Sequence, residues 1–453
     1  MNQTKRVIML EFNELCPPLM DKFIAEGHLP HFKQLRDASE CFITDAGEDV
    51  KNLEPWIQWI TVHTGLSYKE HGIFNLGDGG ELASDSIWDI LSKKQMKSWV
   101  CGSMNVNYDA KNLRGIVLPD PWSKNIEPSD EVLSPFYDFV RANVQEHTNE
   151  TFKLGFKEKL SFLMFMATHG LSFQTVKAII EQLLNERKDS NEGWKRATIL
   201  DRLQWDVFKH TYKKEKPDFS TFFLNSAAHF QHKYWRHMEP EKFIMKPDSS
   251  ELSIYGNAVL YAYQSLDHVV KEALALRDDE TAIVMCTALS QQPYTQADEE
   301  GGKLFYRPYD FDQLLARLQL KGVTKASPVM SEEYHLVCES EAAAEALEAQ
   351  LGEFTVTGES LFLIRREGRD VFSGCCIHHD LDKSIDIERS GQKVVAFYDI
   401  FYQADSIKSG MHHPDGLFWI STPKAQHKVH KEKLPLTSVM GKVLNVLPVE
   451  TAH

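Results

Sequence analysis

Hydrophobic runs and amphipathic stretches alternate along much of the chain. An apolar run at residues 6–10 is followed by a helical pattern at 19–35 that Gly27 interrupts, and residues 87–106 repeat a helix and then a strand. A further helical pattern leads into the run TAIVMC at 281–286. Short apolar strands that alternate with helices predict a doubly wound α/β fold with a mainly parallel sheet and helices on both faces.

Residues 125–215 carry a different pattern. Apolar side chains recur at i, i+3, i+4 and i+7 in 134–148 and in 175–184, with no strand-like run between them. This periodicity predicts a helical insertion. Within it, residues 160–173 (LSFLMFMATHGLSF) are too short and too interrupted to cross a bilayer. We expect a buried helix there, with an interfacial or partner-binding helix as the alternative.

A second departure from the α/β pattern lies toward the C-terminal end. Residues 309–322, 332–351 and 359–368 together predict a small subdomain of helices and strands, with a helix over the alanine-rich stretch 340–353. The chain is therefore predicted to comprise an α/β core of residues 1–124, 216–302 and 376–453, the helical insertion of 125–215, and a small α+β subdomain of 303–375.

Composition narrows the class of partner. The chain of 453 residues is 42% hydrophobic and 25% charged, as is ordinary for a soluble globular protein. Its net charge of −15, without a dense Lys/Arg block, argues against nucleic acid as a partner. The first apolar run is far shorter than the roughly 20 residues of a membrane span, and no cleavage site follows it. We expect a cytoplasmic protein without a membrane span, and its seven cysteines as reduced thiols.

Polar side chains cluster where loops leave the predicted strands. Glu11, Asn13 and Glu14 lie just after the first strand, with Glu11 and Asn13 on the same side of it. Glu54 precedes a proline. Trp56 and Trp59 follow Glu54 directly. Exposed rings at these positions would suit stacking on a sugar or a base, whereas buried rings would only pack the core.

Histidines form two further groups. His229 and His232 lie three residues apart, on one face if their segment is helical, with Trp235 close behind. His412 precedes a hydrophobic strand. Neutral imidazoles together with carboxylates are ligands for zinc, iron or manganese. No glycine pattern of a dinucleotide or P-loop site and no haem or flavin signature occurs, so we expect none of these cofactors.

Four stretches resemble one family and occur in its order. They are VIMLEFNELCPPLMDKFIAEGHLPHFKQL at 7–35, EPWIQWITVHTGLSYKEHGIFNLGD at 54–78, FQHKYWRHMEPEKF at 230–243 and GMHHPDGLFWI at 410–420. They resemble the type I phosphodiesterase and nucleotide pyrophosphatase branch of the alkaline phosphatase superfamily. The resemblance implies a doubly wound α/β fold and two metal ions, usually zinc. It also implies cleavage of phosphate or sulfate esters through a Thr, Ser or modified Cys nucleophile.

The resemblance carries over only in part when it is taken residue by residue. Asn13 stands where the family has an aspartate ligand, and Pro55, beside Glu54, stands at the position of the nucleophile. Ala228 replaces a second aspartate. The family's Ser-Asp-His-Gly loop corresponds to residues 287–290, which read Thr-Ala-Leu-Ser. Most of the family's charged and nucleophilic groups are therefore replaced.

His232 and His412 match histidine ligands of the family. Neutral ligands cannot offset the charge of two divalent cations, so the ordinary two-metal mechanism is not expected. We predict instead one divalent ion, zinc, manganese or iron, with a carboxylate of Glu11 or Glu54 completing the site. The predicted metal ligands are His232, His412, His229 and Asn13.

Other polar and aromatic residues are assigned to catalysis and substrate. Glu54 and Glu11 are the candidate catalytic residues, as general base or nucleophile. The candidate substrate-binding residues are Asn13, Gln291, Gln292, Trp56, Trp59 and Trp235. We expect the carboxylates, Asn13 and the two family histidines to converge in one cleft.

Two classes of function are compatible with these residues. The first is a hydrolase or transferase with a remodelled site that acts on a phosphate or sulfate ester, carbohydrate-linked if the tryptophans line the site. The second is a non-catalytic protein that keeps the fold and binds a small-molecule ligand. The retained histidine segments favour the enzyme.

Overall fold

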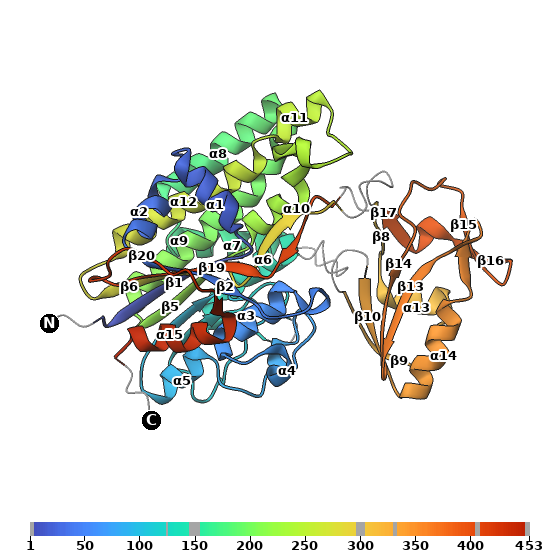
Figure 1. Ribbon diagram of the computed structural model, residues 1–453, viewed down its shortest axis with the longest axis horizontal. Helices are drawn as coiled ribbons and strands as arrows, with labels where there is room; N and C mark the ends of the chain where they lie inside the picture. The colour runs from blue at the N-terminus through green and yellow to red at the C-terminus, as the bar shows by residue number, and fades with distance from the viewer. Residues whose placement is uncertain are drawn as a thin grey trace.

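The structure, a computed structural model, describes residues 4–123, 126–144, 155–295, 304–328, 333–403 and 408–448. Its centre is a nine-stranded sheet in the order β20-β2-β19-β6-β1-β5-β3-β4, with β21 paired to β2 (Figure 1). The strands of this sheet are β1 (Arg6–Phe12), β2 (Glu40–Asp45), β3 (Ser98–Cys101), β4 (Gly115–Leu118), β5 (Phe219–Leu224), β6 (Thr281–Cys286), β19 (Asp415–Ser421), β20 (Lys428–Val429) and β21 (Leu434–Pro435).

The sheet is mainly parallel. The pairs β6-β1, β1-β5, β5-β3 and β3-β4 are parallel, whereas β19 runs antiparallel to both of its neighbours. In this register Glu11 lies level with Phe223 on β5 and with Cys286 on β6. The carboxyl ends of β1, β5 and β6 therefore meet at one edge of the sheet. The predicted doubly wound α/β fold is confirmed.

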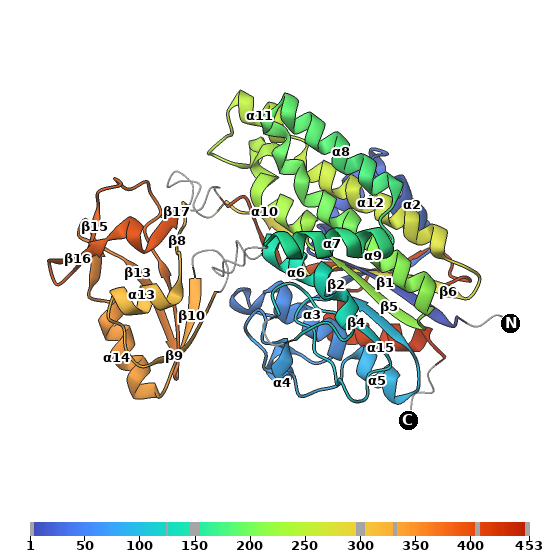
Figure 2. The same ribbon diagram turned by 180° about the vertical axis from the view of Figure 1, so that it is seen from behind.

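Helices cover both faces of the sheet (Figures 1 and 2). Alternate side chains of β1 enter different cores, with Val7 and Met9 on one face and Ile8 and Leu10 on the other. A strand buried on both faces is apolar throughout, as β1 nearly is. On the face of Ile8 lie α1 (Pro17–Ala25), α2 (Pro30–Asp37), α9 (Ala197–Glu215), α10 (Ser226–Met238) and α12 (Ala258–Leu276), and on the opposite face lie α3 (Pro55–Thr64), α4 (Tyr68–His71), α5 (Ile87–Lys93) and α15 (Val439–Val446).

Proline and glycine set the ends of two helices near the site. Helix α1 begins at Pro17, where a missing N–H costs nothing, and the chain turns at Gly27 with φ of +81°. The predicted interruption at Gly27 is confirmed. Helix α3 begins at Pro55, so Glu54 is its N-cap residue, and it ends at Gly65 with φ of +70°. Glu54 is thereby held at the positive end of a helix.

The described part of 125–215 contains only helices and their connections. They are η3 (Glu131–Leu133), α6 (Ser134–Val144), α7 (Phe156–Thr168), α8 (Phe173–Lys188), η5 (Ser190–Arg196) and α9. Helix α7 packs on α6 through stacked rings of Phe139 and Phe162, whose centroids are 3.7 Å apart. Helix α9 packs against the central sheet through Trp205 and Phe222.

The small subdomain lies to one side of the core (Figure 1) and has its own apolar centre. Its sheets have the orders β13-β14-β10-β9, β12-β11-β15-β16 and β17-β8. Its elements are β8 (Tyr306–Pro308), α13 (Phe311–Arg317), β9 (Val323–Pro328), β10 (Glu333–Cys338), α14 (Glu341–Leu351), β11 (Phe354–Val356), β12 (Glu359–Ser360), β13 (Phe362–Glu367), β14 (Asp370–Cys375), β15 (Asp386–Arg389), β16 (Gln392–Ala396), η8 (Phe397–Asp399) and β17 (Phe401–Gln403).

The predicted end of this subdomain at residue 375 is wrong. Its apolar centre includes Ile387, Phe397 and Phe401, and β17 pairs with β8 at its start. Residues 376–403 therefore belong to the subdomain and not to the α/β core. Strand β16 exposes most of its side chains, so this stretch lacks the apolar run from which the other strands were predicted.

The subdomain contacts the core through the loop that follows α4. The rings of Phe74 and Phe372 meet edge to face with centroids 5.2 Å apart, and His335 Nδ1 lies 2.9 Å from Asn75 Oδ1. The indole Nε1 of Trp56 donates to the carbonyl of Phe74 at 2.7 Å. One loop thus joins the subdomain to the first turn of α3.

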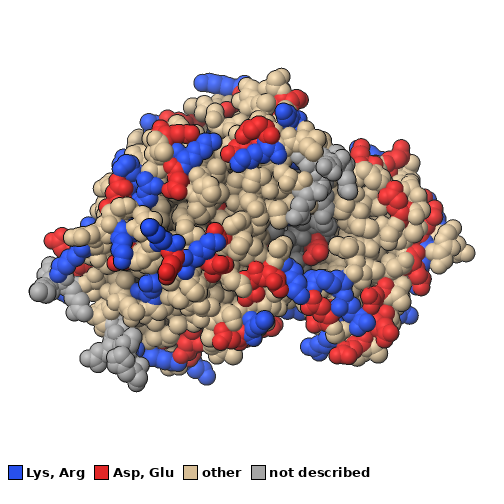
Figure 3. All heavy atoms as spheres, in the orientation of Figure 1, with Lys and Arg blue, Asp and Glu red and all other residues tan. Residues whose placement is uncertain are grey.

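The remaining described elements are η1 (Val50–Asn52), η2 (Gly79–Glu81), η6 (Pro240–Lys242), α11 (Ser249–Tyr255), β7 (Ser290–Pro293), β18 (Gly410–His413) and η9 (Leu436–Ser438). Among the described residues, no helix has the length and apolar character that a membrane span requires. Acidic and basic side chains are interspersed over the face shown in Figure 3.

Candidate metal centre

Three segments bring polar side chains to the carboxyl edge of the central sheet. Asn13 and Glu14 follow β1, and His232 lies on α10, which follows β5. His412 lies on β18, which pairs with β7 just after β6, so that His412 stands opposite Gln291. This edge is where α/β sheets bind their ligands.

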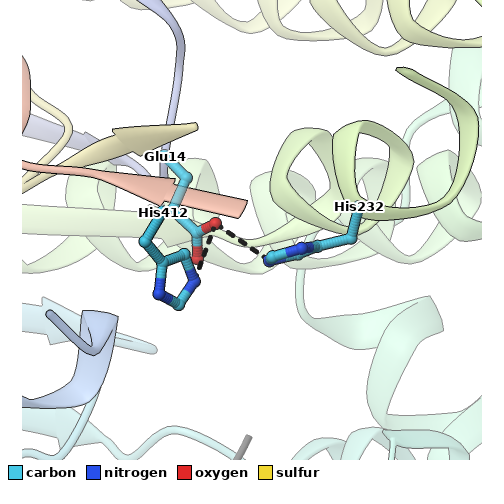
Figure 4. A group of neighbouring side chains, drawn as sticks. All are labelled: Glu14, His232 and His412. Atoms are coloured by element: carbon cyan, nitrogen blue, oxygen red, sulfur yellow. Dashed lines mark ion pairs between the residues drawn. The ribbon is translucent and has the colours of Figure 1, made fainter. Parts of the chain in front are cut away.

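Glu14, His232 and His412 form a compact cluster (Figure 4). Glu14 Oε2 lies 3.2 Å from His232 Nε2 and 3.4 Å from His412 Nε2. The three ligand atoms lie within 4.8 Å of one another. The Glu14 side chain is 3% exposed and that of His232 is 27% exposed, so the cluster reaches solvent on the side of His232.

Backbone carbonyls orient both imidazoles. His232 Nδ1 lies 3.0 Å from the carbonyl oxygen of Gly410, and His412 Nδ1 lies 2.6 Å from that of Leu53. A carbonyl oxygen only accepts, so each Nδ1 carries its hydrogen and each Nε2 faces Glu14. His412 Nε2 has no hydrogen-bond partner among the described residues. Histidines that bind metal through Nε2 are held in this way by their other nitrogen.

Glu14 is fixed from several sides. Its backbone adopts the left-handed conformation with φ of +62°, which is uncommon for a residue other than glycine. Asn13 Nδ2 donates to its Oε1 at 2.8 Å, and Gln291 Nε2 donates to its Oε2. Its carbonyl accepts from Gln231 Nε2 at 2.7 Å. These bonds hold the carboxylate in one position between the two imidazoles.

The charge of the centre is concentrated on Glu14. Burial alone would raise the pKa of this carboxyl, but the neighbouring His412 and His232 outweigh burial and hold the pKa well below its usual range. Glu14 is therefore an anion over the whole range of physiological pH. An anionic oxygen next to two imidazole nitrogens is a site for a cation.

The donor set fits one divalent cation. Two imidazoles and one carboxylate are ligands that zinc, manganese and iron(II) accept. Two atoms held about 2.1 Å from one zinc at a tetrahedral angle lie about 3.4 Å apart. The separations of 3.2 and 3.4 Å from Glu14 Oε2 agree with that value. Over the described part of the chain, this is the group of three His, Cys, Asp or Glu side chains with ligand spacing.

Glu54 lies beside the cluster at the first turn of α3. Its Oε2 is 3.7 Å from His412 Nδ1 and has no hydrogen-bond partner among the residues described. Burial raises the pKa of Glu54 well above its usual range; Lys408 opposes this, while Glu14 and Glu333 add to it. A carboxyl group with a raised pKa, Glu54, thus lies next to one with a lowered pKa, Glu14.

Other residues predicted for the site surround Glu14. Asn13 Nδ2 also donates to Asn225 Oδ1 at 2.7 Å, and Asn13 Oδ1 accepts from Trp59 Nε1 at 2.8 Å. Asn13 therefore positions the carboxylate and is outside the ligand cluster. Gln291 donates to Glu14, as described, and Gln292 Nε2 donates to the carbonyl of His412 at 3.2 Å. Both glutamine side chains therefore donate hydrogen bonds to groups of the protein itself.

The structure does not bring Glu11 to this centre. Glu11 is completely buried below the edge, where its Oε1 lies 2.8 Å from His63 Nε2 and its Oε2 accepts from Ser103 Oγ at 2.7 Å. Its side chain points to the face of the sheet that α3 and α5 cover. Strand alternation correctly put Glu11 on the side of Asn13, but the helices above that face close it off from solvent. The predicted catalytic role of Glu11 is not supported.

His229 also stands apart from the cluster. It precedes His232 by three residues on α10, yet its side chain is exposed and outside the group with ligand spacing. The offset of three residues turns His229 by about 60° from His232 around the helix axis. The predicted role of His229 as a ligand is therefore not supported.

The three tryptophans predicted to bind substrate are core residues. Trp56, Trp59 and Trp235 are 6%, 0% and 2% exposed. Each indole N–H is bonded to the protein, that of Trp235 to Glu239 Oε2 at 2.8 Å. Buried rings offer no face to a sugar or base, so the substrate-stacking prediction is wrong.

Sequence reasoning missed Glu14 as a ligand. It follows Asn13 directly, and alternation along an extended strand would put it on the opposite side. The left-handed turn at Glu14 ends that alternation and brings its carboxylate to the histidines. The signal in the sequence was a second carboxylate two residues beyond the strand and just before the Cys-Pro-Pro start of α1.

The positions at which family ligands are replaced add no donor. Pro55 carries no nucleophile, and Thr287 Oγ1 accepts from the backbone N–H of Leu417 at 2.8 Å. Ala288 and Leu289 are completely buried. Ala288 also has a left-handed φ of +57°, so this loop, like Glu14, keeps an unusual backbone at the sheet edge. Among the described residues, the donors with ligand spacing remain Glu14, His232 and His412.

Comparison with solved structures gives, among others, the three proteins that follow. Phosphonoacetate hydrolase from Sinorhizobium meliloti 1021, in complex with phosphonoformate, is 11% identical, with 98% of this chain and 96% of that chain covered and a TM-score of 0.45. Murine ectonucleotide pyrophosphatase/phosphodiesterase 5 is 11% identical, with 99% and 96% covered and a TM-score of 0.45. The human protein of the same name is 12% identical, with the same coverage and a TM-score of 0.46.

Comparison with curated protein sequences gives no match. The family model for type I phosphodiesterase/nucleotide pyrophosphatase matches residues 7–300, which is well over half of the chain. The matched range includes Glu14, Glu54 and His232, and the family assignment rests on it. The chain belongs to the type I phosphodiesterase/nucleotide pyrophosphatase family.

Proposed function

We propose that this protein is a metal-dependent hydrolase of phosphate esters that works with one divalent cation, held by Glu14, His232 and His412. The observation that carries the proposal is the orientation of the two imidazoles. Each Nδ1 is fixed by a backbone carbonyl, and each Nε2 is turned toward one carboxylate oxygen. A purely structural ion pair has no need of two histidines held in this way.

The ion would supply charge neutralisation. When bound, it would polarise a phosphoryl oxygen and offset negative charge that develops during ester cleavage. Glu14 balances part of the charge of the cation, while Asn13 and Gln291 keep the carboxylate from turning away. The exposed side of His232 leaves a direction from which an ester can approach.

Glu54 is the proposed proton donor. It occupies the position next to the family's nucleophile, at the N-terminus of α3, and is the carboxyl group next to His412. Its Oε2 has no bond that competes with substrate among the described residues. A proton given from Oε2 to the leaving oxygen would assist departure of the alcohol. With proline at the nucleophile position, attack by water is the simplest route.

A sulfate ester is the second substrate class to assay, because it presents the same tetrahedral anion to the cation. Transfer to an acceptor other than water would use the same residues. A carbohydrate-linked substrate loses its support, since the three tryptophans are buried. A non-catalytic binding role is favoured by one observation, the absence of a hydroxyl or thiol at Pro55.

Metal content and ester hydrolysis test the proposal together. Untagged protein is loaded separately with zinc, manganese and iron(II), dialysed, and analysed by inductively coupled plasma mass spectrometry. The same samples are assayed with bis(p-nitrophenyl) phosphate, p-nitrophenyl phosphate and p-nitrophenyl sulfate. We expect about one ion per chain and turnover of a phosphate ester. His232→Ala and His412→Ala should lose both the ion and the activity.

His229→Ala is the matched control, because it removes an exposed imidazole from the same helix three residues away. It should keep the ion and the activity. Metal content unchanged in both His232→Ala and His412→Ala would contradict the proposed centre. One bound ion without turnover of any of the esters would instead favour the binding role.

A further inference from the structure

The side-chain amide of Asn13 links three parts of the molecule at the carboxyl edge of the sheet. Its Nδ2 lies 2.8 Å from Glu14 Oε1 and 2.7 Å from Asn225 Oδ1, and its Oδ1 lies 2.8 Å from the indole Nε1 of Trp59. Asn225 is the N-cap residue of α10, which carries His232, and Trp59 lies on α3 on the opposite face of the sheet. Asn13 therefore connects the carboxylate of Glu14 to helices of both layers.

Only one orientation of this amide satisfies its neighbours. An indole N–H can only donate a hydrogen bond, so the atom of Asn13 that faces Trp59 is the oxygen. An ionised carboxylate can only accept, so the atom that faces Glu14 is the nitrogen. A reversed amide would place two acceptors together at Glu14 and two donors together at Trp59. The indole and the carboxylate therefore select the same orientation.

The bond from Trp59 lies in the protein interior. Trp59 is 0% exposed and Asn13 is 1% exposed. A buried carbonyl oxygen that loses its donor carries the full cost of leaving water, so without the indole N–H the amide would move toward another donor. Such a movement would draw Nδ2 away from Glu14 Oε1. Donation to an amide oxygen also strengthens the hydrogen bonds that the same amide donates.

The bond to Oε1 keeps the other oxygen of Glu14 directed at the histidines. Glu14 Oε2 is the oxygen that lies 3.2 Å from His232 Nε2 and 3.4 Å from His412 Nε2. Because Asn13 holds Oε1, rotation of the carboxylate is restricted. Oε2 therefore stays between the two imidazoles, where a cation would bind.

The indole of Trp59 is itself held on two sides. Its ring meets Phe223 of β5 edge to face, with centroids 5.6 Å apart, and stacks with the ring of His63 at 5.7 Å. His63 Nε2 lies 2.8 Å from Glu11 Oε1, and both side chains are buried. The pair of Glu11 and His63, which lies outside the cation site, thus supports the ring that bonds Asn13.

We propose that Trp59 is a positioning residue of the cation site, acting through Asn13 on the carboxylate of Glu14. This inference rests on the proposed function, because it names a residue that prepares Glu14 for the cation. Trp59 lies outside the ligand cluster, so its effect reaches the site through the amide of Asn13. A tryptophan of the core would thereby determine how tightly the edge of the sheet binds a cation.

The zinc dissociation constant of Trp59→Phe tests the proposal. Phenylalanine keeps an aromatic ring but has no N–H, so the constant should rise about tenfold, as is usual when a partner of a metal ligand is removed. Competition with a chromophoric chelator measures the constant on the full chain. Trp88→Phe is the matched control, since Trp88 is also completely buried and its indole donates to the carbonyl of Asn107 at 2.7 Å. Both variants should lower the melting temperature similarly, but Trp88→Phe should leave the zinc constant unchanged.

Asn13→Ala separates action through the amide from a general loss of packing. This variant should also raise the zinc dissociation constant, and adding Trp59→Phe to it should cause no further rise. A full tenfold rise in the Asn13→Ala background would overturn the proposal, because Trp59 would then act by another route. So would a dissociation constant of Trp59→Phe equal to that of the parent protein.

Nuclear magnetic resonance of the metal-free protein, labelled in histidine, gives a measurement that needs no cation. The spectra of His232→Ala and His412→Ala identify the signals of these two imidazoles. Both signals should shift in Trp59→Phe and stay in place in the control. A parent that binds no zinc but shows these shifts would contradict the proposed function and support the placement of Glu14 by Trp59. No zinc binding together with unchanged imidazole signals would overturn both.

Discussion

At the scale of single residues, the conformation of Glu14 determines the centre. A left-handed residue with a side chain costs about 1–2 kcal/mol relative to an ordinary conformation. Here the cost is offset by the bonds that Gln231, Asn13 and Gln291 make to Glu14. The backbone N–H of Glu14 also donates to the carbonyl of Thr287 at 3.3 Å. Such strain persists where the surrounding bonds impose it, as at binding sites.

Glu54→Gln should lower activity without removing the cation. The amide keeps the size of the side chain but cannot give up a proton, so kcat should fall by about 10²–10⁴-fold. The metal content should equal that of the parent protein, because Glu54 is outside the ligand cluster. Steady-state kinetics and mass spectrometry on the same sample measure the two quantities. Undiminished kcat would exclude Glu54 as the proton donor.

Asp201 on α9 should make stability depend on pH. Burial raises the pKa of this carboxyl from 3.8 to about 7. Below pH 3.8 it is protonated in both the folded and the unfolded chain and has no effect. Between pH 3.8 and about 7 the unfolded chain releases the proton more readily than the folded chain. The free energy of unfolding therefore falls as pH rises through this range. Above about pH 7 Asp201 is ionised in both states, and the destabilisation caused by its buried charge stays constant.

Asp201→Asn removes this dependence, because the amide is neutral at every pH. The variant's free energy of unfolding minus that of the parent should be about 2–3 kcal/mol larger at pH 8 than at pH 5. Urea unfolding at the two pH values measures the gain. An equal difference between variant and parent at both pH values would mean that Asp201 is ionised in the folded protein throughout this range.

At the scale of elements, the strands and helices of the core could be predicted because each has its own spacing of apolar residues along the chain. The run TAIVMC is apolar throughout and forms β6, and Gly27 ends α1 where a positive φ is needed. The loop after β6 could not be predicted in the same way. Residues 290–293 form β7 only because β18, more than a hundred residues later, pairs with them.

The contact between His335 and Asn75 should couple the subdomain to the core. Asn75→Ala and His335→Ala each leave a buried polar atom without its partner, at a cost of about 1–3 kcal/mol. In a double-mutant cycle by chemical denaturation, the pair should show a coupling energy of about 1 kcal/mol. Strictly additive losses would indicate that this hydrogen bond does not hold the subdomain in place.

At the scale of the whole molecule, sequence alone predicted the family, the fold class and the two histidines of the cluster. The third ligand depended on one backbone torsion angle, which no periodicity encodes. Burial of Trp56, Trp59 and Trp235 depended on which helices close over the sheet, and that is a property of the assembled chain. Predictions from local pattern therefore succeeded for elements, whereas the turn at Glu14 and the burial of the tryptophans could not be read from it.

The cation should stabilise the molecule as a whole. Glu14, His232 and His412 come from the start, the middle and the end of the chain, so only the folded protein brings them together. A cation present at 100 times its dissociation constant adds about 2.7 kcal/mol to the free energy of unfolding. EDTA should therefore lower the melting temperature of the loaded protein by a few degrees, as measured by scanning calorimetry.

The same loss is expected in His229→Ala, which keeps the cluster. His232→Ala should start at the lower temperature and not respond to EDTA. A response of His232→Ala equal to that of the parent would show that the stabilising cation binds elsewhere.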